Sequence, residues 1–431
     1  MKRILGAVLL GALPAAPAAA LQENPPSYPR TAAEIKAILG ALAGKRGSIP
    51  DEFIARLQQY RFLCGVPFED LEWNPEQAEL AYYASFLCAR LDRLTHEPPR
   101  PPGVTDREYE RGRKGAAECN LFAGRTSPRE CVDGWMDDSD ARNIARVGHR
   151  RWILNPAMGS SGFGAFGRYA AMYAHDASRA SVPDWDFVAY PARGFMPLEF
   201  FSGFSGPRRA WSVSPHPAKF RIPDRVEVTV VPVDGRLAPR GAPLRVDSVN
   251  VDRGGFGSGP AIIFRPLDLT LAHDALFRVE ILGTDPPLRY LVHFIDAARV
   301  PDGPETAAAL GRFFQARHAR ILSIADPVDR AQALADLLES EGSRGMDPRT
   351  RAAVQKSLSE LLRDPVVRRE HDASARYRLV ARLEQEAGTD RRELARAAAA
   401  YRDLARACDG TRAGRRAAQD FERLKAQLQQ P

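Results

Sequence analysis

The sequence has no apolar segment long enough to cross a membrane. Its first apolar run, Ile4–Leu13, has about ten residues, whereas a membrane-spanning helix needs about twenty, and no later segment comes close. The sequence also has neither an HExxH zinc-protease motif nor a Ser/His/Asp arrangement typical of a nucleophilic hydrolase. We therefore expect a protein that does not span a membrane and that carries none of the common hydrolase motifs.

The excess of positive charge is small for a chain of this length. Lysine and arginine number 61, and aspartate and glutamate number 54, which gives a formal charge of +7. The excess consists mostly of arginine and is spread along the chain between acids. Nucleic-acid binding proteins instead concentrate their cations in a patch or stripe. We expect no nucleic-acid partner.

The first twenty residues have the pattern of an export signal. Lys2 and Arg3 precede the apolar run, and Ala18-Ala19-Ala20 supplies the small residues that a signal peptidase accepts. We expect residues 1–20 to be a signal peptide and the protein to be secreted, or to reside in the periplasm or cell envelope. No cysteine follows the run to accept a lipid, although a tethered N-terminus stays an alternative.

Cysteine is scarce, with five residues in 431. Cys64, Cys88, Cys119 and Cys131 fall in the N-terminal third and could form two disulfides in three ways. We favour Cys64–Cys88 and Cys119–Cys131. Four free buried thiols are the alternative, because free cysteine also behaves as a small core residue. Cys408, the fifth cysteine, is left without a predicted partner.

Residues 31–180 are mainly helical by their apolar spacing. Asn74 and Pro75 are a typical helix cap and first helical residue. Apolar residues then recur at helical spacing as far as Leu94, so we expect this helix to place His96 at its C-terminal end.

Two further regions follow, so the predicted fold class is multidomain. Residues 185–300 begin as a proline-rich linker and then show the period of two that is typical of strands, which predicts a small β-sandwich. Residues 305–431 return to a helical pattern. Their last two helices, 393–407 and 412–428, predict a helical hairpin. A tetratricopeptide-like array is the alternative, and the simple hairpin is preferred because several repeats of about 34 residues are not found.

Chemistry-bearing side chains gather in the N-terminal region. His96 and His149 each lie beside a proline- or glycine-defined break, and Asp138 lies three residues after Trp135 on a predicted helix. Two imidazoles with acids between them could line one cleft that holds a divalent metal or a polar ligand. Structural histidines and solvated helix acids are the alternative.

Several motifs in this region together resemble those of the CAP superfamily, the cysteine-rich secretory, antigen 5 and pathogenesis-related proteins, and in particular its bacterial secreted branch. The segments that carry the resemblance occur in the family's order over about 110 residues: Tyr60–Cys88, LTHEPP (Leu94–Pro99), CNLFAG (Cys119–Gly124), the helix of Trp135, GHRRWILNP (Gly148–Pro156) and GFG (Gly162–Gly164). The resemblance implies an α-β-α sandwich over residues 31–180 whose central cleft is formed by two histidines and two acids.

Carried over residue by residue, the resemblance places His96, Asp138 and His149 on three of the four cleft positions. The fourth position, a glutamate before Asn-Leu in the family, is occupied here by Cys119, and Glu118 stands one residue early. A shift of one residue changes the direction of a side chain strongly. The sequence therefore leaves open whether Glu118 enters the cleft.

The resemblance implies a secreted protein that acts by binding. Its expected partners are a cell-wall glycan, a lipid or an envelope protein, and the strands and C-terminal helices would be further interaction modules. The alternative is a metal-dependent hydrolase that uses His96, Asp138 and His149. Two histidines with Asp138, or with a Cys119 thiolate, would suit zinc in an open site, and a thiolate ligand would exclude a Cys119–Cys131 disulfide.

Overall fold

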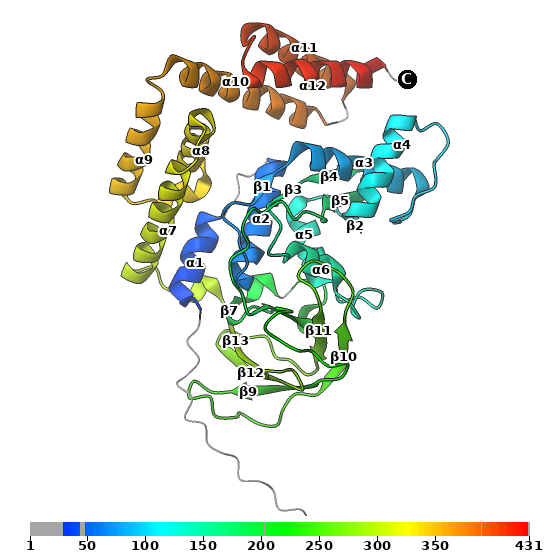
Figure 1. Cartoon of the computed structure of the whole chain (residues 1–431), viewed down its shortest axis with the longest axis vertical. Coiled ribbons are helices and arrows are strands. Elements are labelled where there is room, and N and C mark those ends of the chain that lie inside the picture. Colours follow the sequence, from blue (N-terminus) through cyan, green and yellow to red (C-terminus); the bar gives the residue numbers. More distant parts are fainter. Residues whose placement is uncertain (1–28, 44–47, 202, 389, 430–431) are drawn as a thin grey trace, which may run out of the picture.

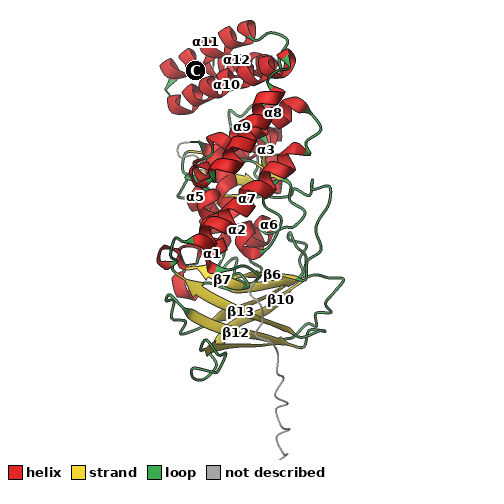
Figure 2. Cartoon of the chain, turned by 90° about the vertical axis from the view of Figure 1, so that its left-hand side faces the viewer, coloured by secondary structure: helices red, strands yellow, loops and turns green. Residues whose placement is uncertain are grey.

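The computed structural model describes residues 29–43, 48–201, 203–388 and 390–429. The predicted signal peptide, residues 1–20, lies outside this part of the chain. Within it, none of the helices combines the length and apolar character that crossing a membrane requires. The strands of residues 187–295 lie at one end of the molecule and the C-terminal helices at the other (Figures 1 and 2).

The N-terminal elements surround a small antiparallel sheet of order β2-β5-β4. In chain order they are α1 (Ala32–Ala41), α2 (Ile49–Cys64), β1 (Glu72–Trp73), α3 (Pro75–Leu91), α4 (Asp106–Glu118), β2 (Cys119–Ala123), α5 (Pro128–Asp137), α6 (Gly148–Ile153), β3 (Ser160–Ser161), β4 (Phe163–Phe166) and β5 (Tyr169–Tyr173). In this sheet Cys119 is paired with Tyr173 and Phe163 with Met172. Strands β1 and β3 form a separate parallel pair.

Helix α3 begins as its sequence predicts and ends earlier. The Asn74 side chain accepts hydrogen bonds from the backbone N–H groups of Glu76 and Gln77, with Pro75 at the first position. At the other end Asp92 adopts a left-handed conformation with φ of 48°, which stops the helix at Leu91. Leu94 is 47% exposed. The expectation that His96 ends this helix is therefore wrong, and His96 lies on the loop that follows.

Two glycines allow α3 to pack directly on the sheet. A Cβ atom at Gly162 would lie 2.1 Å from the backbone nitrogen of Ala78, and one at Gly164 would lie 2.2 Å from that of Tyr82. Only a residue without a side chain fits at these positions. The GFG segment thus sets the distance between α3 and the strands.

The middle of the chain forms two four-stranded sheets, of order β10-β11-β8-β6 and β7-β13-β12-β9. Their elements are β6 (Phe187–Tyr190), β7 (Gly194–Pro197), η1 (Leu198–Phe200), η2 (Gly206–Arg208), β8 (Trp211–Pro215), β9 (Glu227–Val233), β10 (Val246–Asp252), β11 (Ala261–Pro266), β12 (Ala275–Leu282), β13 (Leu288–Ile295) and η3 (Ala297–Arg299). Trp211 of one sheet contacts Phe277 and Phe294 of the other, each at 6.2 Å between ring centroids. Aromatic side chains therefore fill the space between the sheets.

The rest of the chain is helical, as the sequence predicts. It contains α7 (Pro304–Leu322), α8 (Pro327–Glu339), η4 (Glu341–Gly345), α9 (Pro348–Leu361), α10 (Pro365–Ala387), α11 (Arg391–Ala407) and α12 (Arg412–Gln429). Helix α7 packs beside α1, so the first helix of this region lies against the N-terminal part of the chain. Helices α10, α11 and α12 form a separate layer above the remainder (Figure 1).

Buried side chains of the described residues form a large core, a separate cluster in the C-terminal helices and smaller clusters, one of them between α3 and the three-stranded sheet. The large core runs from Ile35 in α1 through Trp135, Trp211 and Phe294 to Val354 in α9. A second cluster, which includes Tyr401 and Leu424, lies within α10–α12. The predicted boundaries near residues 180 and 300 thus separate stretches of sequence whose side chains share a core.

Buried arginines join the N-terminal elements to the two large sheets. Arg150, fully buried, donates to the carbonyl of Met136 at 2.8 Å and to the hydroxyl of Ser212 on β8 at 3.0 Å. Arg209 is buried against Asp137, with 3.1 Å between their charged atoms. A buried cation is stable only when its donors are satisfied, so these contacts hold the two parts in a fixed relation.

Candidate functional site

Asp138 and His149 form a direct pair. Asp138 ends α5 in a left-handed conformation, and one of its carboxylate oxygens lies 2.8 Å from Nδ1 of His149. Its other oxygen accepts from the backbone N–H of His149 at 2.9 Å. Val147, which precedes α6, provides no side-chain cap, so Asp138 caps this short helix from outside. The imidazole is thereby held in one orientation with Nε2 pointing away from the pair.

The pair favours the charged form of His149. Burial alone would lower the pKa of this imidazole, but the Asp138 carboxylate more than offsets that effect and the pKa is raised. The Asp138 side chain is 1% exposed and that of His149 is 22% exposed. The raised pKa widens the pH range in which a positively charged imidazole lies in front of this buried carboxylate.

His96 is exposed on the loop after α3, and its Nδ1 lies 2.7 Å from the carbonyl oxygen of Ala116. Because a carbonyl can only accept, Nδ1 must carry the proton. In the neutral ring, Nε2 is then an acceptor that is available to a ligand.

Glu118 and Cys119 face opposite sides. Cys119 begins β2 and is 3% exposed, packed with Ala84 and Cys88. Glu118 is the last residue of α4, and its side chain lies near Tyr173 and His175, where its carboxylate acts to raise the pKa of each. One carboxylate oxygen of Glu118, Oε2, is buried and has no hydrogen-bond partner among the described residues.

Ring contacts connect His175, which lies near Glu118, with α6, the helix that carries His149. The rings of His175 and Trp152 lie 4.3 Å apart between centroids, and Trp152 follows His149 by three residues on α6, which places both on one face of the helix. His96 and Glu118 both affect the pKa of His175, which burial lowers overall. His96 and His149 themselves share no hydrogen-bond partner in the described part of the chain.

Sequence reasoning missed Trp152, Tyr173, His175 and Phe256. Trp152 could have been found from its three-residue spacing after His149. Tyr173 and His175 reach Glu118 only because β5 pairs with β2. Phe256 comes from the loop between β10 and β11 and lies 6.4 Å from Trp152 between ring centroids, a contact that no local pattern reveals.

All five cysteines are buried free thiols. The two favoured pairings, Cys64–Cys88 and Cys119–Cys131, are not formed in the structure. The physical reason is their packing: Cys64 and Cys131 belong to the large core, whereas Cys88 and Cys119 belong to a small cluster between α3 and the sheet. Burial raises the pKa of the Cys64 and Cys131 thiols to about 12 and that of Cys119 well above its usual value, so none of these three is predisposed to act as a thiolate ligand.

The residues expected to hold zinc do not fit the ion as they are arranged. Among the described residues, no three histidine, cysteine, aspartate or glutamate side chains are grouped so that they could hold a metal. Nδ1 of His149 is committed to Asp138, and Cys119 packs away from Glu118.

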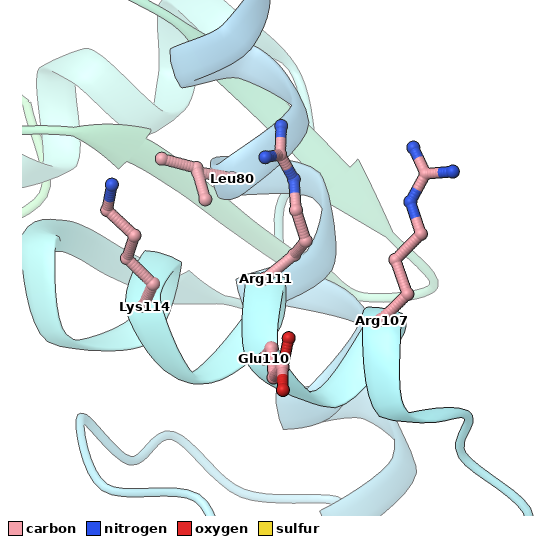
Figure 3. A pocket seen from close by; sticks show the side chains of 5 residues that line it. All are labelled: Leu80, Arg107, Glu110, Arg111 and Lys114. Carbon is pink, nitrogen blue, oxygen red and sulfur yellow. The ribbon is translucent and has the colours of Figure 1, made fainter.

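Two cavities of the molecule lie outside this site. One, of about 440 Å³, lies between α3 and α4 and is lined by Leu80, Arg107, Glu110, Arg111 and Lys114. Figure 3 shows its three basic side chains projecting to one side of α4 while Glu110 points away from them. Arg107 and Arg111 are both paired with Glu79. The second cavity, of about 290 Å³, lies at the start of α10, and neither contains a predicted site residue.

Residues 57–173 match the model of the CAP family, described as the cysteine-rich secretory protein family. The match supports the predicted resemblance to the CAP superfamily over this segment. It includes His96, Glu118, Cys119, Asp138 and His149 and ends at Tyr173. Proteins of this family are typically secreted and have extracellular binding roles. Comparison with curated proteins and with solved structures found no match for the chain.

Proposed function

We propose that this is an exported, non-enzymatic protein of the bacterial secreted CAP branch that binds a ligand or partner at the cell envelope or outside the cell. Its N-terminal part would be the α-β-α sandwich of that family. The binding cleft would be formed by His96, Glu118, Asp138 and His149. A cell-wall glycan, a lipid and an envelope protein are the partners that the resemblance suggests.

The observation that carries the proposal is the unsatisfied oxygen of Glu118. A buried polar atom without a hydrogen bond costs about 1–3 kcal/mol, and native proteins leave few of them without a reason. A hydrogen-bond donor from outside the protein would satisfy this oxygen. Because the acceptor is already desolvated, a ligand donor placed there would form a stronger bond than on the open surface.

The Asp138–His149 pair supports the same reading. A ligand-binding side chain contributes most when it is held in place before the ligand arrives, because less conformational entropy is then lost. His149 is held both through its backbone N–H and through its ring. It offers a directed donor or acceptor at Nε2 that needs no further ordering.

Co-sedimentation would test the proposal. The full-length mature protein is mixed with purified peptidoglycan sacculi or with phosphatidylglycerol vesicles, and the bound fraction is measured for the wild type and for Glu118→Gln. We expect binding to at least one of these materials, and about tenfold weaker binding for the variant because a charge-assisted hydrogen bond is lost.

Glu110→Gln is the matched control, since Glu110 is an exposed glutamate on the same helix. It should bind like the wild type. Equal loss of binding in both variants, or none in Glu118→Gln, would contradict a role for the cleft.

A further inference from the structure

The loop between β10 and β11 lies directly against the helix that carries His149. A Cβ atom at Gly148 would lie 3.0 Å from the ring of Phe256, and one at Gly257 would lie 2.0 Å from the backbone oxygen of Arg151. Gly257 also has a left-handed φ of 48°. Both glycines permit a close approach that a larger residue would prevent.

Arg151 fixes this loop in place. Its guanidinium, 2% exposed, donates to the Asp252 carboxylate at 2.5 Å, to the carbonyl oxygen of Gly254 at 2.7 Å and to that of Gly259. Arg151, which lies on α6, thus holds the loop at its start, middle and end. Phe256 is therefore a fixed neighbour of α6, although it is more than a hundred residues away in sequence.

Three rings form a row between the surroundings of Glu118 and the helix that carries His149. His175 lies 4.3 Å and Phe256 lies 6.4 Å from Trp152 between ring centroids. Trp152 and Phe256 are partly buried, and His175 is exposed. Each ring comes from a different segment, and both His175 and Phe256 lie outside the residues that match the family model.

The charges near the row limit the ligand. Glu118 acts on His175 from one side, and the buried Asp138 lies behind His149 on the other. Asp138 is paired with His149, so Glu118 is the carboxylate that acts on the row, and its charge disfavours phosphorylated ligands such as nucleotides. The unsatisfied oxygen of Glu118 needs a hydrogen-bond donor, and the rings need a flat, weakly polar face. A sugar ring has both, because its hydroxyl groups surround a face of C–H groups.

We propose that His175, Trp152 and Phe256 form one wall of the binding cleft and that the cleft takes a neutral saccharide chain. This inference rests on the proposed binding function and names its ligand class. It also makes the loop between β10 and β11 a part of the site rather than a separate module.

Isothermal titration with a soluble tetramer of β-1,4-linked N-acetylglucosamine would test the inference on the full-length mature protein. We expect the wild type to bind the tetramer, and Phe256→Ala and Phe256→Leu to bind it about tenfold more weakly, since one aromatic contact contributes roughly 1 kcal/mol or more. The leucine variant keeps an apolar side chain against Gly148, so folding is preserved. Phe204→Ala, at a phenylalanine that is 55% exposed, should bind like the wild type.

Three outcomes would count against it in different ways. Unchanged affinity in both Phe256 variants would overturn the ring wall. No binding of the tetramer, together with Glu118-dependent binding to phosphatidylglycerol vesicles, would overturn the saccharide and keep the binding function. Failure of the tetramer, sacculi and vesicles alike would overturn glycan and lipid binding together.

Discussion

The carboxylate of Asp138 makes two kinds of contact, one with the start of α6 and one with the His149 ring. The residue that ends α5 also caps α6 and orients His149. The sequence placed Asp138 on a helix and left its direction open, and the left-handed φ of 46° decides that direction. A single backbone conformation therefore determines whether this carboxylate faces solvent or contacts His149.

The pKa of His149 should depend on Asp138. In Asp138→Asn the attraction to the imidazolium is lost while burial remains, so we expect the pKa to fall from above 6.5 to below it. Because the folded-state pKa is raised, the pair stabilises the fold fully below about pH 6.5, and this contribution is lost as the pH rises through the folded pKa. NMR titration of the histidine Cε1–Hε1 signals, with urea unfolding at pH 6 and pH 8, measures both effects.

His216→Gln is the control for this titration, because His216 makes an edge-on contact with Trp185 in another part of the molecule. The His149 signal should titrate in it as in the wild type. An unchanged His149 pKa in Asp138→Asn would show that the carboxylate does not act on the ring.

The cysteines should react as free thiols. We expect iodoacetamide to label all five in the denatured protein without any reductant, and to label Cys119 slowly in the native protein because burial keeps it protonated. Intact-mass spectrometry counts the labels. Prior reduction should add none; fewer than five labels that rise to five after reduction would mean that disulfides form.

At the scale of elements, the start of α3 could be predicted from neighbouring residues, whereas its end could not. The cap at Asn74 is a contact between neighbours in sequence, so it was predicted and is confirmed. The predicted end of α3 was wrong because the apolar spacing continues to Leu94, whereas the chain already turns at Asp92. Local hydrophobic spacing does not report that a segment lacks a neighbouring surface to cover it.

Close packing makes Gly164 sensitive to substitution. In Gly164→Ala the new Cβ atom would meet the backbone of α3, so we expect the free energy of unfolding to fall by about 1–3 kcal/mol or more. Urea denaturation followed by circular dichroism measures the change. Gly235→Ala, which has open space around the new atom, should change it by less than about 0.5 kcal/mol, and equal effects of the two would contradict the packing explanation.

At the scale of the whole molecule, the largest core is shared by the three regions that the sequence predicted. It includes side chains of α1, α2, α5–α9 and both large sheets, whereas α3 and α4 contribute to a smaller cluster and α10–α12 form another. Buried Arg150 and Arg209 reinforce the junction between the N-terminal part and the sheets. We therefore expect the α10–α12 layer to unfold apart from the rest.

Tyr401→Ala would test whether the α10–α12 cluster unfolds independently of the large core. Tyr401 is 1% exposed at the centre of the second cluster, and removing such a ring costs about 3–5 kcal/mol. We expect hydrogen exchange to lose protection across residues 365–429 and to keep it across residues 49–361. Leu379→Ala, at a side chain that is 63% exposed, should keep both, and loss of protection throughout the chain would indicate a single cooperative unit.

The sequence by itself determined the helical start, the strand-rich middle, the helical end and the family resemblance of residues 57–173, because periodicity, caps and motifs depend on residues close together in the chain. The tertiary structure alone decided which side chains meet. Glu118 faces Tyr173 and His175 because β2 pairs with β5, and Phe256 reaches α6 because Arg151 ties a distant loop to it. Such contacts depend on packing between segments far apart in sequence, which no local pattern encodes.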